Sequence, residues 1–390
     1  MLNYLPQLEH MLRRKAMKRL RRICLIAGLI FLIATLFFRT AYVHAEKQEL
    51  TFIAVGDVML SRGVGTQIRK HGPTYPFALT AELLRNADLT FANLETQIST
   101  LGVPMAGKEI HFRADTKSIL GLMHAGIDVV SLSNNHSMDF GRDALFDTMD
   151  VLSHHGIAYV GAGMNETAAR RSANFISNAV KVSVLAYSWN FYLTVEATAK
   201  KPGVAVIQRE KTTEGPEIAT TQRKKMAQDI KRAKAWADVV IVSFHWGWEY
   251  ADHPTKTDRK TARHAIDAGA DLVIGHHPHV VQGVEWYKGK LICYSLGNFI
   301  FDQRRIRTRR GLVLRCRFVK EGDISSAELL PITIHPQEFR PKIASGEEAT
   351  SILKEVQKLS LQMKTKVRLD ATESMLILSS QKGIHPQIAP

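Results

Sequence analysis

This chain alternates short apolar, strand-like runs with helical segments over most of its length, and that alternation restricts its fold more than any other feature. Such a pattern is typical of a mainly parallel sheet with helices packed on its faces. After residue 280, strand-like runs follow one another with little helix between them, which favours antiparallel pairing. The sequence therefore predicts an α/β fold in which two facing, mixed sheets are covered by helices.

The expected elements can be placed by their apolar pattern and by the residues that bound them. We expect strands at residues 50–56, 88–95, 127–133, 157–163, 180–188, 237–245, 270–277, 280–287, 291–296, 311–319 and 326–335. We expect helices at residues 76–87, 115–125, 142–155, 222–237, 257–268 and 347–360. Residues 190–220 are polar and irregular in pattern, so we expect an insertion or a lid there.

A dense basic cluster followed by an uncharged apolar run marks the beginning of the chain. Seven Lys and Arg residues stand within residues 13–22, and residues 23–38 carry no charge. Because basic residues stay on the cytoplasmic side of a spanning segment, the chain after Phe38 is expected outside the cytoplasm. We interpret residues 23–38 as an uncleaved, single-pass signal anchor in the cell membrane. Cleavage after Val43-His44-Ala45 is the alternative.

These features predict an organisation in five parts with one extracytoplasmic main domain. The parts are a cytoplasmic basic segment (1–22), the transmembrane anchor (23–38), a linker (39–48), the α/β domain (49–340), and a C-terminal helix and tail (341–390).

Ligand-type side chains follow several expected strands at their carboxyl ends, which is where open α/β sheets bind ligands. Taken singly, each has a structural explanation, since an Asp can cap a helix and a lone His usually lies satisfied in a core. Together they predict a site for one or two divalent metal ions, and the mixture of imidazole and carboxylate favours Mn, Zn or Fe over Mg or Ca. The candidate ligands are Asp57, Glu95, Asn135, His245, His276, His277 and His279.

Two residues beside the candidate ligand Asn135 suggest proton chemistry. His136 follows it directly, and Asp139 stands three residues further on. We expect His136 to face the substrate and to act as a general acid, with Asp139 as the second catalytic residue.

Several motifs in this order resemble the CapA-type proteins of poly-γ-glutamate capsule synthesis, from about residue 50 to 335. They are GDVMLSRGV, ANLET, SLSNNHSMDFG, VGAG, SFHWGWEY, AGADLVIGHHPHVVQGVE and YSLGNFIFDQ. The resemblance implies a divergent branch of the calcineurin-like metallophosphoesterases, with a four-layer α/β/β/α sandwich. It also implies the role of each matching residue: Asp57 as the first metal-binding aspartate, Glu95 as the bridging carboxylate, Asn135 as the metal-binding Asn, His136 as the catalytic His, His245 as the lone metal-binding His, and His276 as the first His of the closing motif.

The sequence departs from the phosphoesterase pattern at three places. Met59 stands where a first-motif His is usual, and the bridging carboxylate is Glu95 rather than an Asp. The closing motif reads GHHPH, so either His277 or His279 is the second ligand there. These departures leave both a one-ion and a two-ion centre open.

Basic residues near the motifs point to an acidic partner. The chain has a net charge of +15, and residues 303–310 (QRRIRTRR) carry five arginines, whose guanidinium groups suit carboxylates. A solvated connecting loop is the alternative explanation of that run. We expect substrate contacts from Arg62, Glu249, Asn298, Arg304 and Arg305. The expected partners are poly-γ-glutamate or another acidic polymer and membrane-embedded synthase subunits, and not nucleic acid, for which no binding motif is present.

Three functions are compatible with these features. The first is a metal-dependent hydrolase or transferase acting in capsule synthesis or export. The second is a non-catalytic, polymer-binding subunit of the membrane synthase. The third is a general extracytoplasmic metallophosphoesterase.

Overall fold

The computed structural model describes residues 17, 25–33, 49–191, 195–212, 215–320, 322–370, 372 and 374–379. They belong to two units, Met1–Gln48 and Glu49–Pro390. In the first unit, residues 25–33 are helical and exposed. Within these described ranges, no helix is both long and apolar enough to cross a membrane. The anchor expected over residues 23–38 extends outside the described residues at both of its ends.

Ten strands of the second unit form one mixed sheet, which we call the first sheet. They are β1 (Glu49–Val58), β2 (Leu89–Leu94), β5 (Val129–Ser131), β6 (Ala158–Val160), β18 (Asn298–Ile300), β19 (Arg310–Val319), β20 (Ile324–Ile334), β21 (Pro341–Ile343), β22 (Arg368–Asp370) and β23 (Met375–Ile377). Their order is β22-β23-β20-β19-β1-β2-β5-β6, with β18 beside β1 and β21 beside β20. The strands β1, β2, β5 and β6 are parallel, whereas β19, β20, β22 and β23 pair antiparallel.

Seven further strands form the second sheet. They are β8 (Ala173–Ser177), β9 (Val180–Trp189), β11 (Val206–Ile207), β14 (Val239–His245), β15 (Leu272–His276), β16 (Val284–Tyr287) and β17 (Lys290–Cys293). Their order is β11-β9-β14-β15-β17-β16, with β8 beside β9. The strands β11, β9, β14, β15 and β17 are parallel, so their carboxyl ends share one edge of the sheet. Three small two-stranded sheets add β3 (Gln97–Ile98) with β4 (Arg113–Ala114), β7 (Ala162–Gly163) with β10 (Gly203–Val204), and β12 (Arg209–Thr212) with β13 (Gly215–Ile218).

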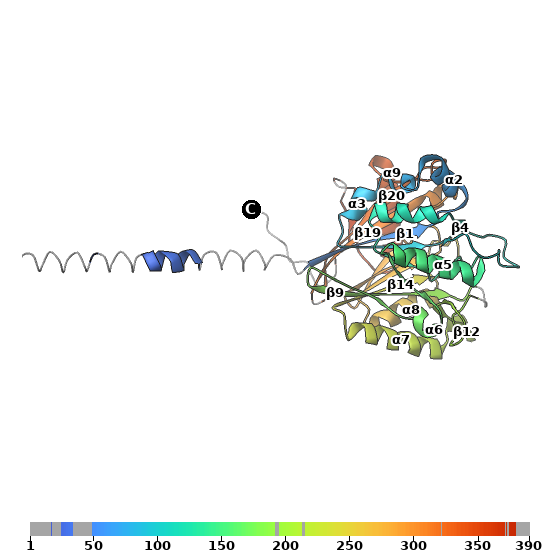
Figure 1. The fold of residues 1–390 in the computed structure, drawn as a ribbon, viewed down its shortest axis with the longest axis horizontal. Helices are drawn as coiled ribbons and strands as arrows, with labels where there is room; N and C mark the ends of the chain where they lie inside the picture. The colour runs from blue at the N-terminus through green and yellow to red at the C-terminus, as the bar shows by residue number, and fades with distance from the viewer. Residues whose placement is uncertain are drawn as a thin grey trace, which may run out of the picture. The chain divides into compact units, whose positions relative to one another are not determined.

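Helices cover the outer face of each sheet. They are α2 (Arg62–His71), α3 (Ala81–Arg85), α4 (Ile119–Ala125), α5 (Gly141–His154), α6 (Glu166–Ala169), α7 (Thr220–Lys234), α8 (Lys256–Asp267) and α9 (Gly346–Gln362), with short 3-10 turns at Tyr75–Phe77, Thr116–Ser118 and Ile306–Arg309. Figure 1 shows β1 and β19 below α2 and α3 and above β9 and β14, with α7 and α8 lower still. The helix α9 contacts β20, β22 and β23 of the first sheet and β16 of the second, so it closes the space between the sheets along one side.

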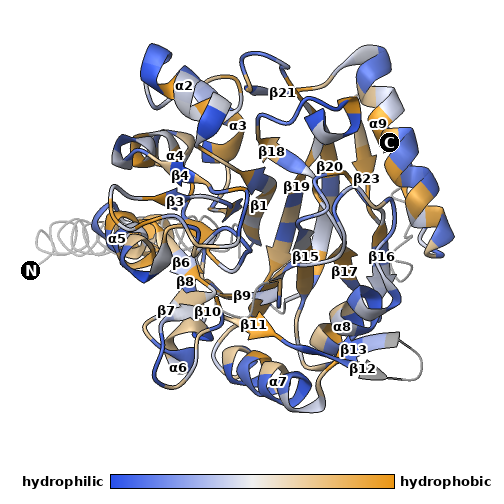
Figure 2. Cartoon of the chain, turned by 90° about the vertical axis from the view of Figure 1, so that its right-hand side faces the viewer, coloured by the Kyte–Doolittle hydropathy of each residue, from blue (hydrophilic) through white to orange (hydrophobic). Residues whose placement is uncertain are grey.

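Alternation along the strands explains why both sheets are buried on two faces. In β1, Phe52 and Ala54 enter the core between the sheets, whereas Ile53 and Val55 enter the core under α2–α5. A side-chain period of two places successive residues on opposite faces, and a strand covered on both faces therefore reads as a continuous apolar run. Figure 2 shows these strands as orange segments between helices whose outer sides are mostly blue.

Most expected elements are confirmed, and two expectations are corrected. The helix expected over residues 76–87 is broken into a 3-10 turn, Tyr75–Phe77, and α3, because Thr80 between them adopts φ −129°, outside the helical region. Within residues 190–220, the segment 203–207 is buried rather than part of an exposed insertion or lid, because β11 extends the second sheet beside β9. The helix α2 was not expected from the sequence.

Candidate metal centre

The carboxyl ends of strands from both sheets meet at one place. In the first sheet, Asp57 at the end of β1 pairs in register with Asn93 of β2 and with Asn298 of β18. In the second sheet, His245 at the end of β14 pairs with His276 at the end of β15. The two sheets meet at these ends, since the Asn93 Nδ2 atom lies 3.3 Å from the His245 Nδ1 atom. The structure therefore brings together the polar side chains that follow these strands, as their positions in the sequence predict.

A glycine precedes one polar residue of the site in each sheet, Asp57 in the first and His276 in the second, and the reason is a close backbone approach. A Cβ atom on Gly56 would overlap the carbonyl oxygen of Gly297, and one on Gly275 would overlap the carbonyl oxygen of Tyr294. Only glycine lets a neighbouring strand approach this closely beside Asp57 and beside His276.

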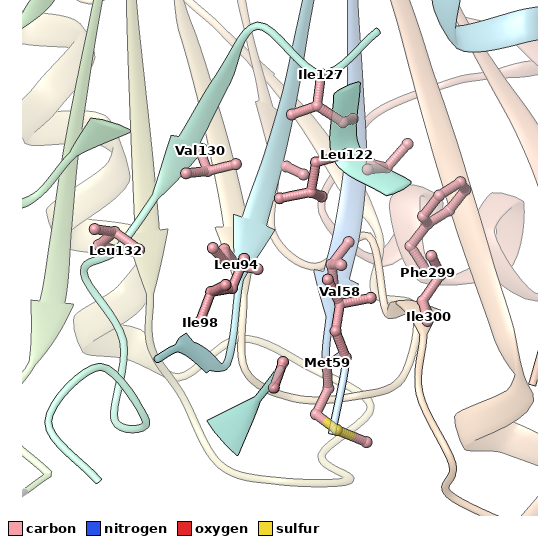
Figure 3. Packing of buried hydrophobic residues seen from close by; sticks show 14 of the residues in the cluster. Val58, Met59, Leu94, Ile98, Leu122, Ile127, Val130, Leu132, Phe299 and Ile300 are labelled. Atoms are coloured by element: carbon pink, nitrogen blue, oxygen red, sulfur yellow. The ribbon is translucent and has the colours of Figure 1, made fainter. Parts of the chain in front are cut away.

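Packed apolar side chains hold the strand ends of the first sheet in place. Val58 and Met59 follow Asp57 directly, Leu94 precedes Glu95, and Figure 3 shows these three side chains packed in one cluster with Phe299 and Ile300. Side chains in such a core have little freedom to move, so the polar residues next to them are held in defined positions.

Two groups of buried side chains in the described residues have donor atoms close enough together to hold a metal ion. One group is Glu95, His245 and His277, and the other is Asp57, Glu95 and His279, with the donor atoms of each group within 4.8 Å of one another. Glu95 belongs to both groups. The Asn135 Oδ1 atom lies 2.9 Å from His245 Nε2, which places this amide beside the first group.

Like the imidazole of His276, the carboxylate of Glu95 is an unsatisfied polar group of the site. It is fully buried, and neither oxygen accepts a hydrogen bond from the described residues. The nearest imidazole nitrogens, those of His136, His245 and His279, lie 3.8–3.9 Å from Oε1. Burial, together with the nearby Asp57 carboxylate, holds the pKa of Glu95 well above its usual range. A buried carboxylate without partners is costly, and a cation between the two groups would supply what it lacks.

The histidines after β15 take different positions. The backbone is left-handed at His277 (φ +95°) and His279 (φ +57°), which is uncommon for residues other than glycine and brings both into the donor groups. His276 is fully buried outside both groups, with its Nδ1 atom 3.3 Å from Asp57 Oδ1. The structure thus places both alternatives for the second ligand, His277 and His279, near Glu95, and it places His276 against Asp57.

The charges of these histidines differ because their surroundings differ. Burial would lower the pKa of His279, but the carboxylates of Glu95 and Asp57 raise that pKa to about 9. Burial holds the pKa of His245 and of His277 well below the usual range, so both rings are neutral and able to act as ligands. Burial alone would raise the pKa of Asp57, but His276 and His279 outweigh it and hold that pKa well below its usual range.

The imidazole of His136 is fixed by two contacts, whose partners are joined by a hydrogen bond of their own. Its Nδ1 atom lies 2.7 Å from Asp139 Oδ2, and its ring stacks on Phe112 with centroids 3.9 Å apart. The amide N–H of Phe112 also donates to Asp139 Oδ2 at 2.6 Å. Burial lowers the pKa of His136 to about 4, so the ring is neutral near pH 7. With Nδ1 directed at Asp139, the Nε2 atom is the one that faces Glu95.

Lys108 is a part of this site that the sequence analysis missed. Its side chain is 3% exposed, and its ammonium group donates to the Asn135 carbonyl at 2.5 Å and to Asp139. It thereby ties the loop that carries Asn135 and His136 to the segment before β4. No periodicity or motif marks Lys108, because its contacts cross about thirty residues of chain between two loops.

Of the residues expected to contact substrate, two lie at the rim of the site. The guanidinium of Arg62 lies 4.7 Å from the centre of the Phe112 ring, and that of Arg305 lies 4.7 Å from the centre of the Tyr250 ring. Tyr250 in turn lies 6.4 Å from His279, between ring centroids. Both arginines therefore stand over aromatic rings that touch histidines of the site.

The other three expected contacts occupy different positions in and around the site. Asn298 is fully buried and its Oδ1 atom lies 2.8 Å from His279 Nδ1, so it orients that imidazole. Glu249 is exposed, and Arg304 is exposed beside α2. Within the arginine run, Arg307 and Arg310 form ion pairs with Asp252 and Glu355, respectively, so these two are engaged with the protein itself.

Comparisons with known proteins agree with the motifs. Residues 51–303 match the family model described as bacterial capsule synthesis protein PGA_cap. The chain is 32% identical over 324 residues to the capsule biosynthesis protein CapA of Bacillus anthracis, covering 81% of this chain and 76% of that protein. It is 32% identical over 306 residues to the PGA biosynthesis protein CapA of Bacillus subtilis, covering 78% and 77%. It is 30% identical over 275 residues to a Mycobacterium tuberculosis protein named probable polyglutamine synthesis accessory protein, covering 67% and 70%.

An α/β fold of two mixed sheets, with buried carboxylates and imidazoles that could hold a metal ion, is thus joined to a sequence match over most of the chain. The chain belongs to the bacterial capsule synthesis protein PGA_cap family. The resemblance seen in the motifs is confirmed.

Proposed function

We propose that this protein is a membrane-anchored, extracytoplasmic component of poly-γ-glutamate capsule synthesis or export, with a divalent metal centre in a metallophosphoesterase-like sandwich. The names of its relatives support the process, and the basic, apolar beginning of the chain supports the anchor. The donor groups support the metal, because carboxylate oxygen and imidazole nitrogen together suit Mn, Zn or Fe. The proposed ligands are Asp57, Glu95, Asn135, His245, His277 and His279.

The observation that carries the metal proposal is the buried, unpartnered carboxylate of Glu95. It stands in both donor groups, and its burial without a hydrogen bond is unfavourable unless a cation is present. A carboxylate shared between two groups is also what a two-ion centre requires.

A hydrolytic or transfer reaction is the chemistry we propose for this centre. A bound divalent ion would supply Lewis acidity and lower the pKa of a bound water. The chain's own contribution is at His136, whose ring is oriented by Asp139 and whose Nε2 atom is placed to move a proton beside Glu95. Arg305 at the rim would attract the carboxylates of an acidic polymer, whereas Arg62 beside it is paired with Asp302.

Elemental analysis of the purified full chain, combined with polymer secretion by cells that depend on it, tests this proposal. We expect stoichiometric Mn, Zn or Fe in the wild type. We expect His136→Gln to retain the metal and to lose polymer output. Retention of output by His136→Gln would instead favour the non-catalytic, polymer-binding subunit, and a wild type that takes up no metal even after reconstitution would refute the metal centre.

Protease accessibility tests the location. Without protease, the protein is expected in the membrane fraction. Protease added outside intact spheroplasts is expected to digest residues 49–390. Protection of this unit until the membrane is broken would contradict the extracytoplasmic assignment.

A further inference from the structure

Arg209 lies at the same edge of the second sheet as the histidines of the metal centre. Its strand β12 begins two residues after β11, which pairs with β9 in parallel with Ile207 opposite Trp189. The neighbouring strand β14 pairs with β9 so that His245 stands opposite Ser188, directly before Trp189. The topology therefore brings Arg209, Trp189 and His245 to one edge.

The guanidinium of Arg209 is held by two aromatic rings. It lies 5.0 Å from the centre of the Trp189 ring and 5.9 Å from that of Trp248. Trp189 is itself fixed, because it is buried and its indole N–H donates to Asp258 at 2.8 Å. Stacking on aromatic faces fixes the plane of a guanidinium while leaving the N–H groups along its edge available.

Arg209 is half-buried, and no carboxylate of the described residues forms an ion pair with it, in contrast to Arg62, Arg170 and Arg263. Burial lowers the pKa of Arg209, and the negative charge of Asp258 opposes that lowering only in part. Asp258 itself accepts hydrogen bonds from Trp189 and from the Thr255 amide in the cap of α8.

A half-buried cation without an ion pair, positioned by two aromatic rings at the edge of the sheet that carries His245, has the properties of a binding group for an anion. We propose that Arg209 is an anion-binding residue of this site, whose guanidinium, positioned by Trp189 and Trp248, binds a carboxylate or phosphate group of the substrate at that edge. This inference rests on the proposed function, since it assumes an anionic substrate at the metal centre. It adds one cation on the side of the second sheet, with Arg62 and Arg305 near His136 and His279.

Calorimetric titration of the full, metal-loaded chain tests the proposal with two probes, a γ-linked glutamate oligomer and phenyl phosphate. We expect Arg209→Gln to weaken the binding of at least one probe by about tenfold or more, since a charge-assisted bidentate contact is lost. Arg209→Lys is expected to recover only part of that loss, because a lysine keeps the charge but not the planar fork. The probe that is affected identifies the anion as carboxylate or phosphate.

The matched control is Arg317→Gln, which removes the same charge from an exposed position opposite Thr51, at the other end of β1 from Asp57. It should bind both probes as the wild type does. If Arg209→Gln does not fold, Trp248→Ala replaces it, because that side chain is 60% exposed and its removal takes away one of the two rings that hold the guanidinium.

The outcomes separate this inference from the proposed function. Unchanged binding of both probes by folded Arg209→Gln overturns the role of Arg209, and so does a metal-loaded wild type that binds neither probe. A wild type that takes up no metal refutes the metal centre, while probe binding that depends on Arg209 would still support the anion site.

Discussion

At the carboxyl ends of β1 and β2 the candidate ligands are carboxylates, whereas at and just after the ends of β14 and β15 they are imidazoles. The backbones of these two halves are alike in one respect, since a closely approached glycine precedes Asp57 in one half and His276 in the other. Both donor groups nevertheless combine the two halves, because each contains Glu95 and at least one histidine. Neither sheet supplies both kinds of ligand by itself. The site therefore depends on the core that packs the two sheets together.

This division also bears on which metal the site would select. Carboxylate oxygens alone suit Mg²⁺ or Ca²⁺, and adding imidazole nitrogens shifts the preference toward Mn, Zn or Fe. Metal binding would therefore stabilise the packing of one sheet on the other, because ligands that come from separate strands are held together by one ion.

The largest effect is expected from Glu95→Gln, which removes the one residue that both donor groups share. We expect metal content to fall to background and the metal-dependent stabilisation to vanish, which for the wild type is about 3 kcal/mol at a hundredfold excess of metal over its Kd. The metal-free variant should be at least as stable as the metal-free wild type, because a buried carboxylate without partners is gone. Elemental analysis and thermal unfolding with and without metal measure this.

Glu328→Gln is the matched control, since Glu328 pairs with Arg315 between β19 and β20 outside the donor groups. Full metal content in Glu95→Gln would show that the Glu95 carboxylate does not bridge the two donor groups.

A smaller loss of metal is expected from substitutions in the imidazole half, which is the set of histidine ligands at and after the ends of β14 and β15, because each of these ligands belongs to one donor group. His277→Ala and His279→Ala should each reduce the metal content by about half, because His277 belongs only to the first group and His279 only to the second. His154→Ala, an exposed substitution on α5, should leave metal content unchanged. Complete loss of metal in either variant would mean that the halves form one mononuclear site rather than two linked groups.

The sequence could predict this site as far as residue type and strand position allow. Asp57, Glu95 and His245 follow buried apolar runs, and parallel strands bring their carboxyl ends together, so the gathering of these residues follows from periodicity alone. The choice among His276, His277 and His279 could not be predicted, because it depends on left-handed backbone at His277 and His279. A positive φ is uncommon for every residue except glycine, so residue type alone does not predict it for one histidine and not for its neighbour.

The fold shows the same limit. The long strands were predictable because their apolar runs are covered on both faces, whereas the helix expected over residues 76–87 is interrupted where tertiary packing buries Phe77. Lys108 was not predictable either, since its role arises from contacts between two loops.

Lys108→Met affects one half of the site only, because Lys108 fixes the Asn135–His136 loop, which follows β5 of the first sheet. We expect polymer output to fall about 10–100-fold, the range typical of outer-shell partners, with metal content retained. We also expect the pKa of His136, about 4, to rise, because removing the nearby positive charge favours the protonated ring. NMR titration of the metal-free protein follows that pKa.

The control for this variant is Lys117→Met, which removes an exposed lysine near the start of α4. A fall in output without any change in the pKa of His136 would make Lys108 a purely structural residue.

The smallest effect is expected from His276→Gln. His276 is the histidine after β15 that contacts Asp57 of the first sheet. Its Nδ1 atom lies 3.3 Å from Asp57 Oδ1, so it contacts a proposed ligand from outside both donor groups. We therefore expect metal affinity to weaken about tenfold while the stoichiometry at saturation stays the same. Competition with a metal chelator measures the affinity, and elemental analysis measures the stoichiometry. Loss of an ion at saturation would instead make His276 a ligand, as the motif resemblance implies. The imidazole ligands after β14 would then begin at the end of β15 itself, and not only in the loop after it.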